Sequence, residues 1–262
     1  MQLSHKLCEW RKLTSDSEVL CTVWGEEIEF SSPHYQLKAP KQNTFSGLEQ
    51  LAVEQEIKKL LAKGVIVQST HEQDEFISPI FLRPKPDGSY RMILNLRGLN
   101  EYVEYKHFKM DYIWHAISLM KPSCYMASVD LKDAYYSVRI CSEHQKYLKF
   151  SWNGTLYKLT CFPNGLALAP RKFTKLLKPV YSSLRKKGHI SSPYIDDSIL
   201  MGDNFNECAL NVVDTVKVLD NLNFVTHPEK SVLLPTQVIV FLGFILNSIT
   251  MTVSLTPEKQ RS

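Results

Sequence analysis

The stretch SSPYIDDSILMG, from Ser191 to Gly202, places two aspartates side by side inside an otherwise apolar run. A carboxylate without a partner is costly to bury, and a β-strand has no structural need for one. Two short strands that meet at or near Asp196 and Asp197 would bring both carboxylates to the tip of a two-residue hairpin turn. The stretch therefore predicts a β-hairpin at a sheet edge, with two negative charges at its tip.

The segments around this hairpin predict the rest of a sheet. SCYMASVDL (123–131) is typical of a strand that ends at an acid, and Asn153-Gly154 favours a type I′ turn between KYLKFSW and TLYKLTCF. Helices are expected from Pro170 and at about 205–223, before a final buried strand, VIVFLGFIL (238–246). This order indicates an α+β fold, an antiparallel sheet backed by helices on one face.

The part of the chain before residue 123 predicts a capped helix. Ser46 and Glu49 form a capping box, and Gly64 ends the helix. The expected apolar face of this helix consists of Leu48, Val53, Ile57, Leu60 and Leu61. Residues 1–45 show only weak periodicity and carry no assignment.

Short strands are expected after this helix. VIV (65–67) and SPIFLRP (78–84) have strand-like patterns, and KPDGSY (85–90) has the chemistry of a turn. YRMILNL (90–96) would then return as the second arm of a hairpin.

The helix expected from Pro170 has two different faces. Its apolar positions are Phe173, Leu176, Leu177, Val180 and Leu184. Its opposite side carries Arg171, Lys172, Lys175 and Lys178, and Arg185, Lys186 and Lys187 follow. These cations either form a solvated surface or contact the phosphates of a nucleic acid, independently of base sequence.

Composition places few limits on function. The net charge of +4 permits an anionic partner without requiring one. The six cysteines form no CxxC pair, which argues against a disulfide framework or a zinc knuckle.

The sequence shows no targeting or membrane-spanning segment. Because Glu9, Arg11 and Lys12 interrupt the start, we expect no signal peptide, and no apolar run is long enough to cross a membrane. We therefore expect an intracellular protein in a reducing compartment, the cytoplasm or the nucleus.

The paired aspartates predict a metal site. Two crowded carboxylates need a cation, or one must take up a proton, and Mg²⁺ prefers oxygen ligands. Asp130 is the candidate third acid, because it ends its strand much as Asp196 ends PYI, and neighbouring strands lie about 5 Å apart. Two metal ions about 3.5–4 Å apart would serve phosphoryl transfer. The alternative is structural, since aspartate is common in turns, and Asp130 with Asp133 would then cap a helix.

Four segments in order resemble the motifs of reverse transcriptases: RPKPDGSYRMILNLRGLN (83–100), VDLKDAYYSV (129–138), FPNGLALAPRKFTKLL (162–177) and YIDD (194–197). Within that family the chain is most similar to retrotransposon enzymes of the DIRS type, through KYLKF, FTKLLKPV and YIDDSIL, and of the Gypsy type. The resemblance covers about residues 46–256.

The resemblance implies a right-hand polymerase. Fingers would span 46–122, and the palm would span 123–246 with an inserted fingers segment around 140–162. Residues 1–45 would be an N-terminal extension, and 247–262 the start of the thumb or connection, with most of the thumb missing. An RNase H domain is expected downstream in a parent polyprotein, so we expect no RNase H activity from this chain.

The resemblance also implies an activity, RNA-directed DNA polymerisation. Asp130 and Asp196 would be the main ligands of two Mg²⁺ ions, or Mn²⁺ in their place, with Asp197 as the third acid. The primer 3′-hydroxyl would attack the α-phosphate of a dNTP on an RNA or DNA template, and Lys230 would protonate the leaving pyrophosphate.

The other site residues follow from the same resemblance. Lys85 and Arg91 would hold the triphosphate, and Tyr135 would exclude a 2′-hydroxyl. Asn164 and Gly165 would lie against the incoming base and template, although the position of Asn164 is more often Phe or Gln in the family. The primer and template contacts would come from Tyr194, Leu242, Gly243, Lys172 and Lys175, with FLGF (241–244) as the primer grip.

Three other functions are alternatives. The residues argue against an RNA-copying RNA polymerase, because such an enzyme usually has a second acid at the place of Tyr135 and Gly-Asp-Asp in place of YIDD. A non-catalytic nucleic-acid binder would keep the groove without the chemistry. A metal-dependent nuclease would also use paired acids. The oligomeric state is not indicated.

Overall fold

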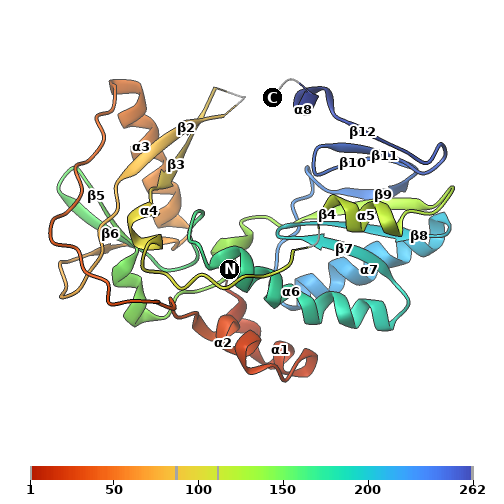
Figure 1. Ribbon diagram of the computed structural model, residues 1–262, viewed down its shortest axis with the longest axis horizontal. Helices are drawn as coiled ribbons and strands as arrows, with labels where there is room; N and C mark the ends of the chain where they lie inside the picture. Colours follow the sequence, from red (N-terminus) through yellow and green to blue (C-terminus); the bar gives the residue numbers. More distant parts are fainter. Residues whose placement is uncertain (1, 86–87, 111, 261–262) are drawn as a thin grey trace.

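The computed structural model describes residues 2–85, 88–110 and 112–260. Two lobes lie side by side, with the amino-terminal helices beneath their junction (Figure 1). The first lobe contains α3, α4, β1–β3, β5 and β6, and the second contains β4, β7–β12 and α5–α7. The observed mixture of helices and antiparallel sheets confirms the predicted α+β class.

In the first lobe, α3 (Gly47–Ala62) begins at the predicted capping box of Ser46 and Glu49. Val53, Ile57 and Leu60 are buried as expected. The predicted apolar face is wrong for Leu48, which is 76% exposed because it lies in the first turn, beyond the packed part of the helix.

Two small sheets complete this lobe. β1 (Ile66–Ser69), β6 (Thr155–Leu159) and β5 (Lys149–Trp152) pair in that order, and Asn153 and Gly154 have the positive φ angles of the predicted type I′ turn. β2 (Ile80–Pro84) and β3 (Tyr90–Leu94) form the second hairpin. Pro86 and Asp87 of its predicted turn lie outside the described residues. The short helices α4 (Arg97–Asn100) and η3 (Ser142–Tyr147) connect these strands to their neighbours.

The second lobe is built on a four-stranded antiparallel sheet. Its order is β7 (Ile190–Tyr194), β8 (Asp197–Gly202), β4 (Tyr125–Asp130) and β9 (Val232–Thr236). α6 (Ala169–Lys186) and α7 (Phe205–Asn221) pack on one face, and α5 (Ile113–Leu119) covers the other. Pro170 lies in the first turn of α6, as predicted.

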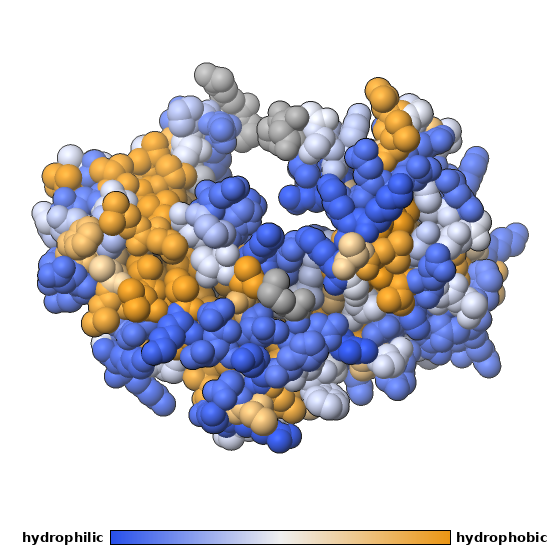
Figure 2. All heavy atoms as spheres, turned by 180° about the vertical axis from the view of Figure 1, so that it is seen from behind, coloured by the Kyte–Doolittle hydropathy of each residue, from blue (hydrophilic) through white to orange (hydrophobic). Residues whose placement is uncertain are grey.

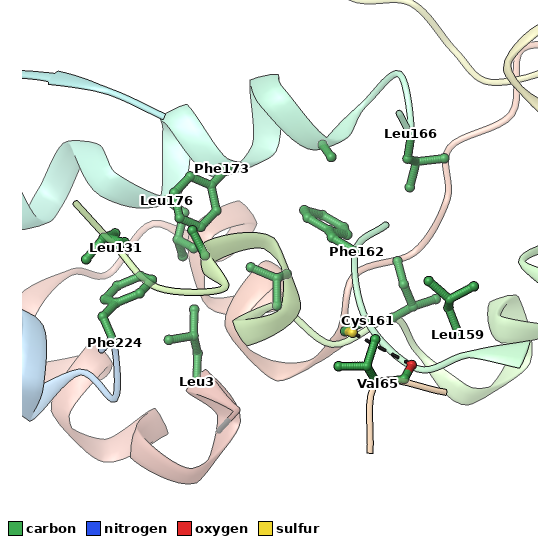
Figure 3. Packing of buried hydrophobic residues seen from close by; sticks show 14 of the residues in the cluster. Leu3, Val65, Leu131, Leu159, Cys161, Phe162, Leu166, Phe173, Leu176 and Phe224 are labelled. Atoms are coloured by element: carbon green, nitrogen blue, oxygen red, sulfur yellow. Dashed lines mark hydrogen bonds between the residues drawn. The ribbon is translucent and has the colours of Figure 1, made fainter. Parts of the chain in front are cut away.

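Alternation along the strands explains the two packed faces. Ala127 and Leu200 point into the main core, whereas Met126 and Met201 point into a separate cluster beneath α5. Figure 3 shows part of the main core, where Phe162, Phe173 and Phe224 lie among aliphatic side chains from both lobes.

The segment 238–246 is not the single strand that its apolar pattern predicts. β10 (Val238–Phe241) and β11 (Phe244–Asn247) form a hairpin, because Leu242 and Gly243 have φ angles of +50° and +78°. β12 (Thr252–Leu255) adds a third strand, and the short α8 (Pro257–Gln260) follows.

The amino-terminal segment is structured. It forms η1 (Leu3–Lys6), α1 (Leu7–Leu13) and α2 (Ser17–Gly25). Leu3 and Trp10 are completely buried, and the Trp10 ring meets Phe224 edge to face at 6.0 Å. Among the described residues, no helix is long and apolar enough to span a lipid bilayer.

Candidate active site

The hairpin predicted from YIDD is present, with one difference in the turn. β7 and β8 are joined by two residues, Ile195 and Asp196, and Asp197 is already the first residue of β8, opposite Tyr194. Ile195 has a φ of +53°. This conformation is unusual for a β-branched residue, and such strain persists only where the surrounding structure fixes it.

The structure brings the third predicted acid to the same place. Asp130 is the last residue of β4 and lies directly opposite Asp197 on β8. The backbone N–H of Leu131 donates to the carbonyl of Asp196 at 2.8 Å, which ties the end of β4 to the turn. Thus Asp130, Asp196 and Asp197 meet at one end of the central strands.

The carboxylates interact unfavourably with one another. Burial and the charges of Asp196 and Asp130 raise the pKa of Asp197 to about 7. Although the Asp196 side chain is partly open to water, loss of hydration and the charge of Asp130 raise its pKa as well. The positive charge of Lys230 lowers the pKa of both Asp196 and Asp197, but one cation does not offset the other effects, which raise it.

The donor chemistry of these acids fits a hard divalent cation. The three side chains offer only oxygen ligands, and their excess negative charge calls for a cation. Among the residues that the structure describes, no group of three or more His, Cys, Asp or Glu side chains already has a metal-binding arrangement. The fit is therefore one of donor type and charge.

A turn at 227–231 forms hydrogen bonds with the backbone of Asp130. The N–H of Asp130 donates to Ser231 Oγ at 3.0 Å, and the carbonyl of Asp130 accepts from the N–H of His227 at 2.8 Å. Lys230 lies on this same exposed turn. The sequence analysis missed Ser231 and His227, whose only signal was their position beside Lys230 in HPEKS.

Tyr135 lies beside the acids, on η2 (Ala134–Ser137). Its ring packs edge to face against Phe162 and Phe173, with centroid distances of 6.4 and 5.5 Å. Burial raises the pKa of its hydroxyl, and the charge of Asp196 adds to the effect. The ring is therefore fixed, neutral and close to Asp196.

The loop with Asn164 and Gly165 is exposed at the start of α6. Gly165 has a φ of +93°, which requires the freedom of glycine. Asn100 fixes the loop, because its Nδ2 donates to the Gly165 carbonyl at 2.8 Å and its Oδ1 accepts from the Ala167 N–H at 2.9 Å. Asn100 ends the quoted motif NLRGLN, but the sequence analysis gave it no role.

Lys85 and Arg91 come from the first lobe. Both lie on the β2–β3 hairpin, and the Arg91 side chain is exposed. The charge of Arg91 acts on Tyr136, which lines a small cavity with Ile80 and Met92 of the first lobe. Figure 2 shows a hollow between the two lobes.

The β10–β11 turn is tightly packed. Lys259 Nζ donates to the Leu242 carbonyl at 3.0 Å and lies 4.2 Å from the centroid of the Phe244 ring. A Cβ at Gly243 would lie 2.7 Å from Lys259 Cδ, which a shift of the flexible lysine side chain would relieve, so glycine is favoured here by its φ of +78°. Tyr194 lies on β7 with its ring 6.2 Å from Tyr112.

The predicted basic face of α6 is wrong for Lys172. This residue is only 4% exposed, and its Nζ lies 2.7 Å from Glu26 and 2.8 Å from Glu29. Lys175 pairs with Glu18. Because α2 and the segment after it supply these carboxylates, the cations hold the amino-terminal segment in place, and the predicted template contact of Lys172 is not retained.

Comparisons with known proteins identify the family of this chain. Residues 83–246 match the family model described as "Reverse transcriptase (RNA-dependent DNA polymerase)". The chain is 25% identical over 218 residues to the Transposon Tf2-3 polyprotein of Schizosaccharomyces pombe, a match that covers 83% of this chain and 16% of the relative. The chain thus spans a small part of such polyproteins.

Solved structures show the same fold. A foamy viral protease-reverse transcriptase in complex with double-stranded DNA has a TM-score of 0.72 at 23% identity, covering 98% of this chain and 44% of that one. The foamy viral enzyme in complex with an RNA/DNA hybrid has a TM-score of 0.68 at 23% identity, covering 98% of this chain and 34% of that one. Since the family model also matches more than half of the sequence, the chain belongs to the reverse transcriptase family.

Proposed function

We propose that this chain is the RNA-directed DNA polymerase domain of a retrotransposon polyprotein and adds dNTPs to a primer 3′-hydroxyl on an RNA or DNA template. The observation that carries the proposal is the meeting of Asp130, Asp196 and Asp197 at a strained turn, in a member of the reverse transcriptase family. The similarity to the Tf2-3 polyprotein supports a Gypsy-like retrotransposon as the source. The DIRS-type assignment and the intracellular location stay predictions.

The three acids would hold two divalent cations, with Mg²⁺ as the proposed identity and Mn²⁺ as a substitute. When bound, such ions stabilise the attacking and leaving oxygens of a phosphoryl transfer. The protein contributes the rigid placement of the acids: β4 and β8 set Asp130 against Asp197, and Ile195 fixes the turn. Lys230, on the turn at 227–231 that is bonded to the Asp130 backbone, would donate a proton to the leaving pyrophosphate.

Substrate selection would use both lobes. Lys85 and Arg91 would contact the triphosphate from the first lobe, and the packed Tyr135 ring would exclude a 2′-hydroxyl. Asn164 and Gly165 would meet the incoming base, in a loop that Asn100 fixes. Leu242 and Gly243 would hold the primer, with Tyr194 beside it. In this proposal, fingers span 46–122 with the insertion at about 140–162, the palm spans 123–246, and 247–262 leads to the thumb.

The test is primer extension on an RNA template with Mg²⁺, in parallel with dNTPs and rNTPs. Extension with dNTPs alone supports the proposal, and extension with rNTPs alone would indicate the RNA polymerase alternative. Template binding without extension would identify the non-catalytic binder. Degradation of the template in place of extension would identify the nuclease.

A further inference from the structure

Two buried polar side chains hold the β7–β8 hairpin to the helices on one face of the sheet. At the end far from the acids, Asn211 Nδ2 on α7 donates to the carbonyls of Ile190 at 2.8 Å and Met201 at 3.1 Å. At the end near the acids, the Tyr181 hydroxyl on α6 donates to Ser198 Oγ at 2.7 Å. The hairpin is therefore tied to a different helix at each end.

The Tyr181–Ser198 hydrogen bond lies next to the strand pair that carries Asp130 and Asp197. Ser198 follows Asp197 on β8. It lies opposite Val129, the residue before Asp130 on β4. Its Oγ also donates to the Val129 carbonyl at 3.4 Å. The two hydroxyls thus link α6, β8 and β4 one residue away from both acids.

Packing alone does not explain a serine at position 198. The side chain is 2% exposed and lies in the apolar part of β8, where a buried position usually carries an apolar residue. A buried hydroxyl is costly unless it is hydrogen-bonded, and Tyr181, which is 1% exposed, supplies the donor. Burial raises the pKa of Tyr181 to about 12, so its hydroxyl keeps the proton that it donates. Both side chains are therefore held in one arrangement.

The other side of β4 is held less regularly. The pairing of β4 with β9 shifts register between Met126 and Ser128. At the end of the strand, the N–H of Asp130 donates to a side chain, Ser231 Oγ. By contrast, all 6 residues of β4 pair with β8 in one register. The β8 side is therefore the regular support of Asp130.

We propose that Tyr181 and Ser198 are positioning residues, whose hydrogen bond fixes the end of β4 against β8 and so the relative position of Asp130 and Asp197. The bond acts through the backbones of the two strands. Its consequence for metal ions rests on the proposed polymerase function, since that function makes the two acids metal ligands. Loss of support around metal ligands weakens metal binding, because the ligands must converge on one ion.

The test compares two variants that each remove one buried hydroxyl. Tyr181→Phe removes the donor at the end of the hairpin near the acids and keeps the ring. Thr215→Val is the matched control at the far end, because buried Thr215 donates to Asn211 Oδ1 at 3.1 Å. Each variant loses one hydrogen bond, so both should lower the melting temperature by a similar amount, about 2–4 °C.

Amide hydrogen exchange tests the proposal without metal or substrate. The N–H of Leu131, which donates to the Asp196 carbonyl, reports how firmly the end of β4 is held to the turn. Its exchange should be roughly 2- to 10-fold faster in Tyr181→Phe than in Thr215→Val, as expected for the loss of one local hydrogen bond. The rates are compared at an equal interval below each melting temperature. Equal rates at Leu131 in the two variants would overturn the proposal.

Mn²⁺ binding to the full chain, measured by electron paramagnetic resonance without nucleotide, tests the consequence for the acids. The Kd for Mn²⁺ should rise roughly 3- to 10-fold in Tyr181→Phe, less than the 10–100-fold typical of side chains that contact a metal ligand directly. It should be unchanged in Thr215→Val. The double variant Tyr181→Phe with Ser198→Ala should bind no more weakly than Tyr181→Phe, because the two hydroxyls act as one unit.

The outcomes separate this inference from the proposed function. An unchanged Kd in Tyr181→Phe, or additive losses in the double variant, would overturn the link between the hydroxyl pair and the acids. A wild-type chain that binds no Mn²⁺ would instead overturn the proposed metal site, and the exchange rate of Leu131 would still decide whether the pair fixes the strand ends.

Discussion

Two clusters of carboxylates in this molecule have opposite electrostatics. Between α2 and α6, a hydrogen bond from Lys175 lowers the pKa of Glu18 to about 2, and hydrogen bonds from Lys106 and Lys172 outweigh burial to lower that of Glu29 to about 2. At the end of β4 and β8, burial and neighbouring acids raise the pKa of Asp197 to about 7. The first cluster is neutralised within the protein, whereas the acids of the second have no such compensation. The opposite direction of the pKa shift makes the second cluster the candidate for binding a cation.

The largest effect is expected from neutralising the acids of the second cluster. Asp196→Asn should lower the rate of primer extension by at least about 10²–10³-fold, because one metal ligand is lost. It should leave template binding and thermal stability intact, since it removes a charge that its neighbours repel. Asp220→Asn, at an exposed position on α7, is the matched control and should retain full activity. Full activity in Asp196→Asn would contradict the metal assignment.

Removing a cation from the first cluster should affect stability most. Lys172→Met leaves the buried carboxylate of Glu26 without its 2.7 Å partner, so unfolding should become easier by about 3–5 kcal/mol. Chemical denaturation measures this change. Lys186→Met, at an exposed position on the same helix, is the control and should shift stability by less than about 0.5 kcal/mol. A similar loss of stability in both variants would mean that the ion pairs of Lys172 do not stabilise the fold.

A residue next to the acids, Tyr135, should change the choice of substrate. Tyr135→Ala opens space where a 2′-hydroxyl would lie, so discrimination against rNTPs should fall by roughly 10- to 200-fold. Tyr135→Phe keeps the ring and should keep the discrimination. The ratio of kcat/KM values for matched dNTP and rNTP substrates is the measurement, and an unchanged ratio in Tyr135→Ala would assign the gate elsewhere.

The smallest effect is the contribution of Glu18, in the first cluster, to the pH dependence of stability. Glu18 and Glu29 have a folded pKa of about 2, against 4.5 for the free side chain. Their contribution to the free energy of unfolding is therefore present above about pH 4.5 and is lost as the pH falls toward 2. In Glu18→Gln, the fall in melting temperature between pH 5 and pH 3 should be shallower than in the wild type. Parallel curves would show that the pairing of Glu18 adds little to stability.

Local patterns predicted the positions of Asp130, Asp196 and Asp197 well, because each of them lies in a short stretch with a clear strand or turn pattern. VDL ended a strand at Asp130 as expected, and the Asn153-Gly154 turn formed as predicted. YIDD formed the predicted hairpin, but its turn consists of Ile195 and Asp196, and Asp197 already begins β8. The first cluster was not predictable in this way. Lys172 and Glu26 lie far apart in the chain, and helical periodicity placed Lys172 on a solvated face.

Two other regions show where hydrophobic patterns mislead. The run VIVFLGFIL contains enough apolar residues for one strand, but the positive φ angles of Leu242 and Gly243 divide it into a hairpin. Residues 3–25 have weak periodicity, because Leu3 and Trp10 fill gaps between elements from elsewhere in the chain. Neither outcome depends on local pattern alone.

The left-handed backbone of Ile195 limits how this position can vary. A left-handed conformation disfavours most side chains by about 1–2 kcal/mol, so Ile195→Gly would relax the loop. A relaxed turn would also no longer hold the neighbouring carboxylates in one orientation. Variants at this residue should therefore have a higher melting temperature and, in the proposed polymerase, a lower fidelity of nucleotide incorporation. Error rates measured across a series of substitutions at this position would reveal that trade-off.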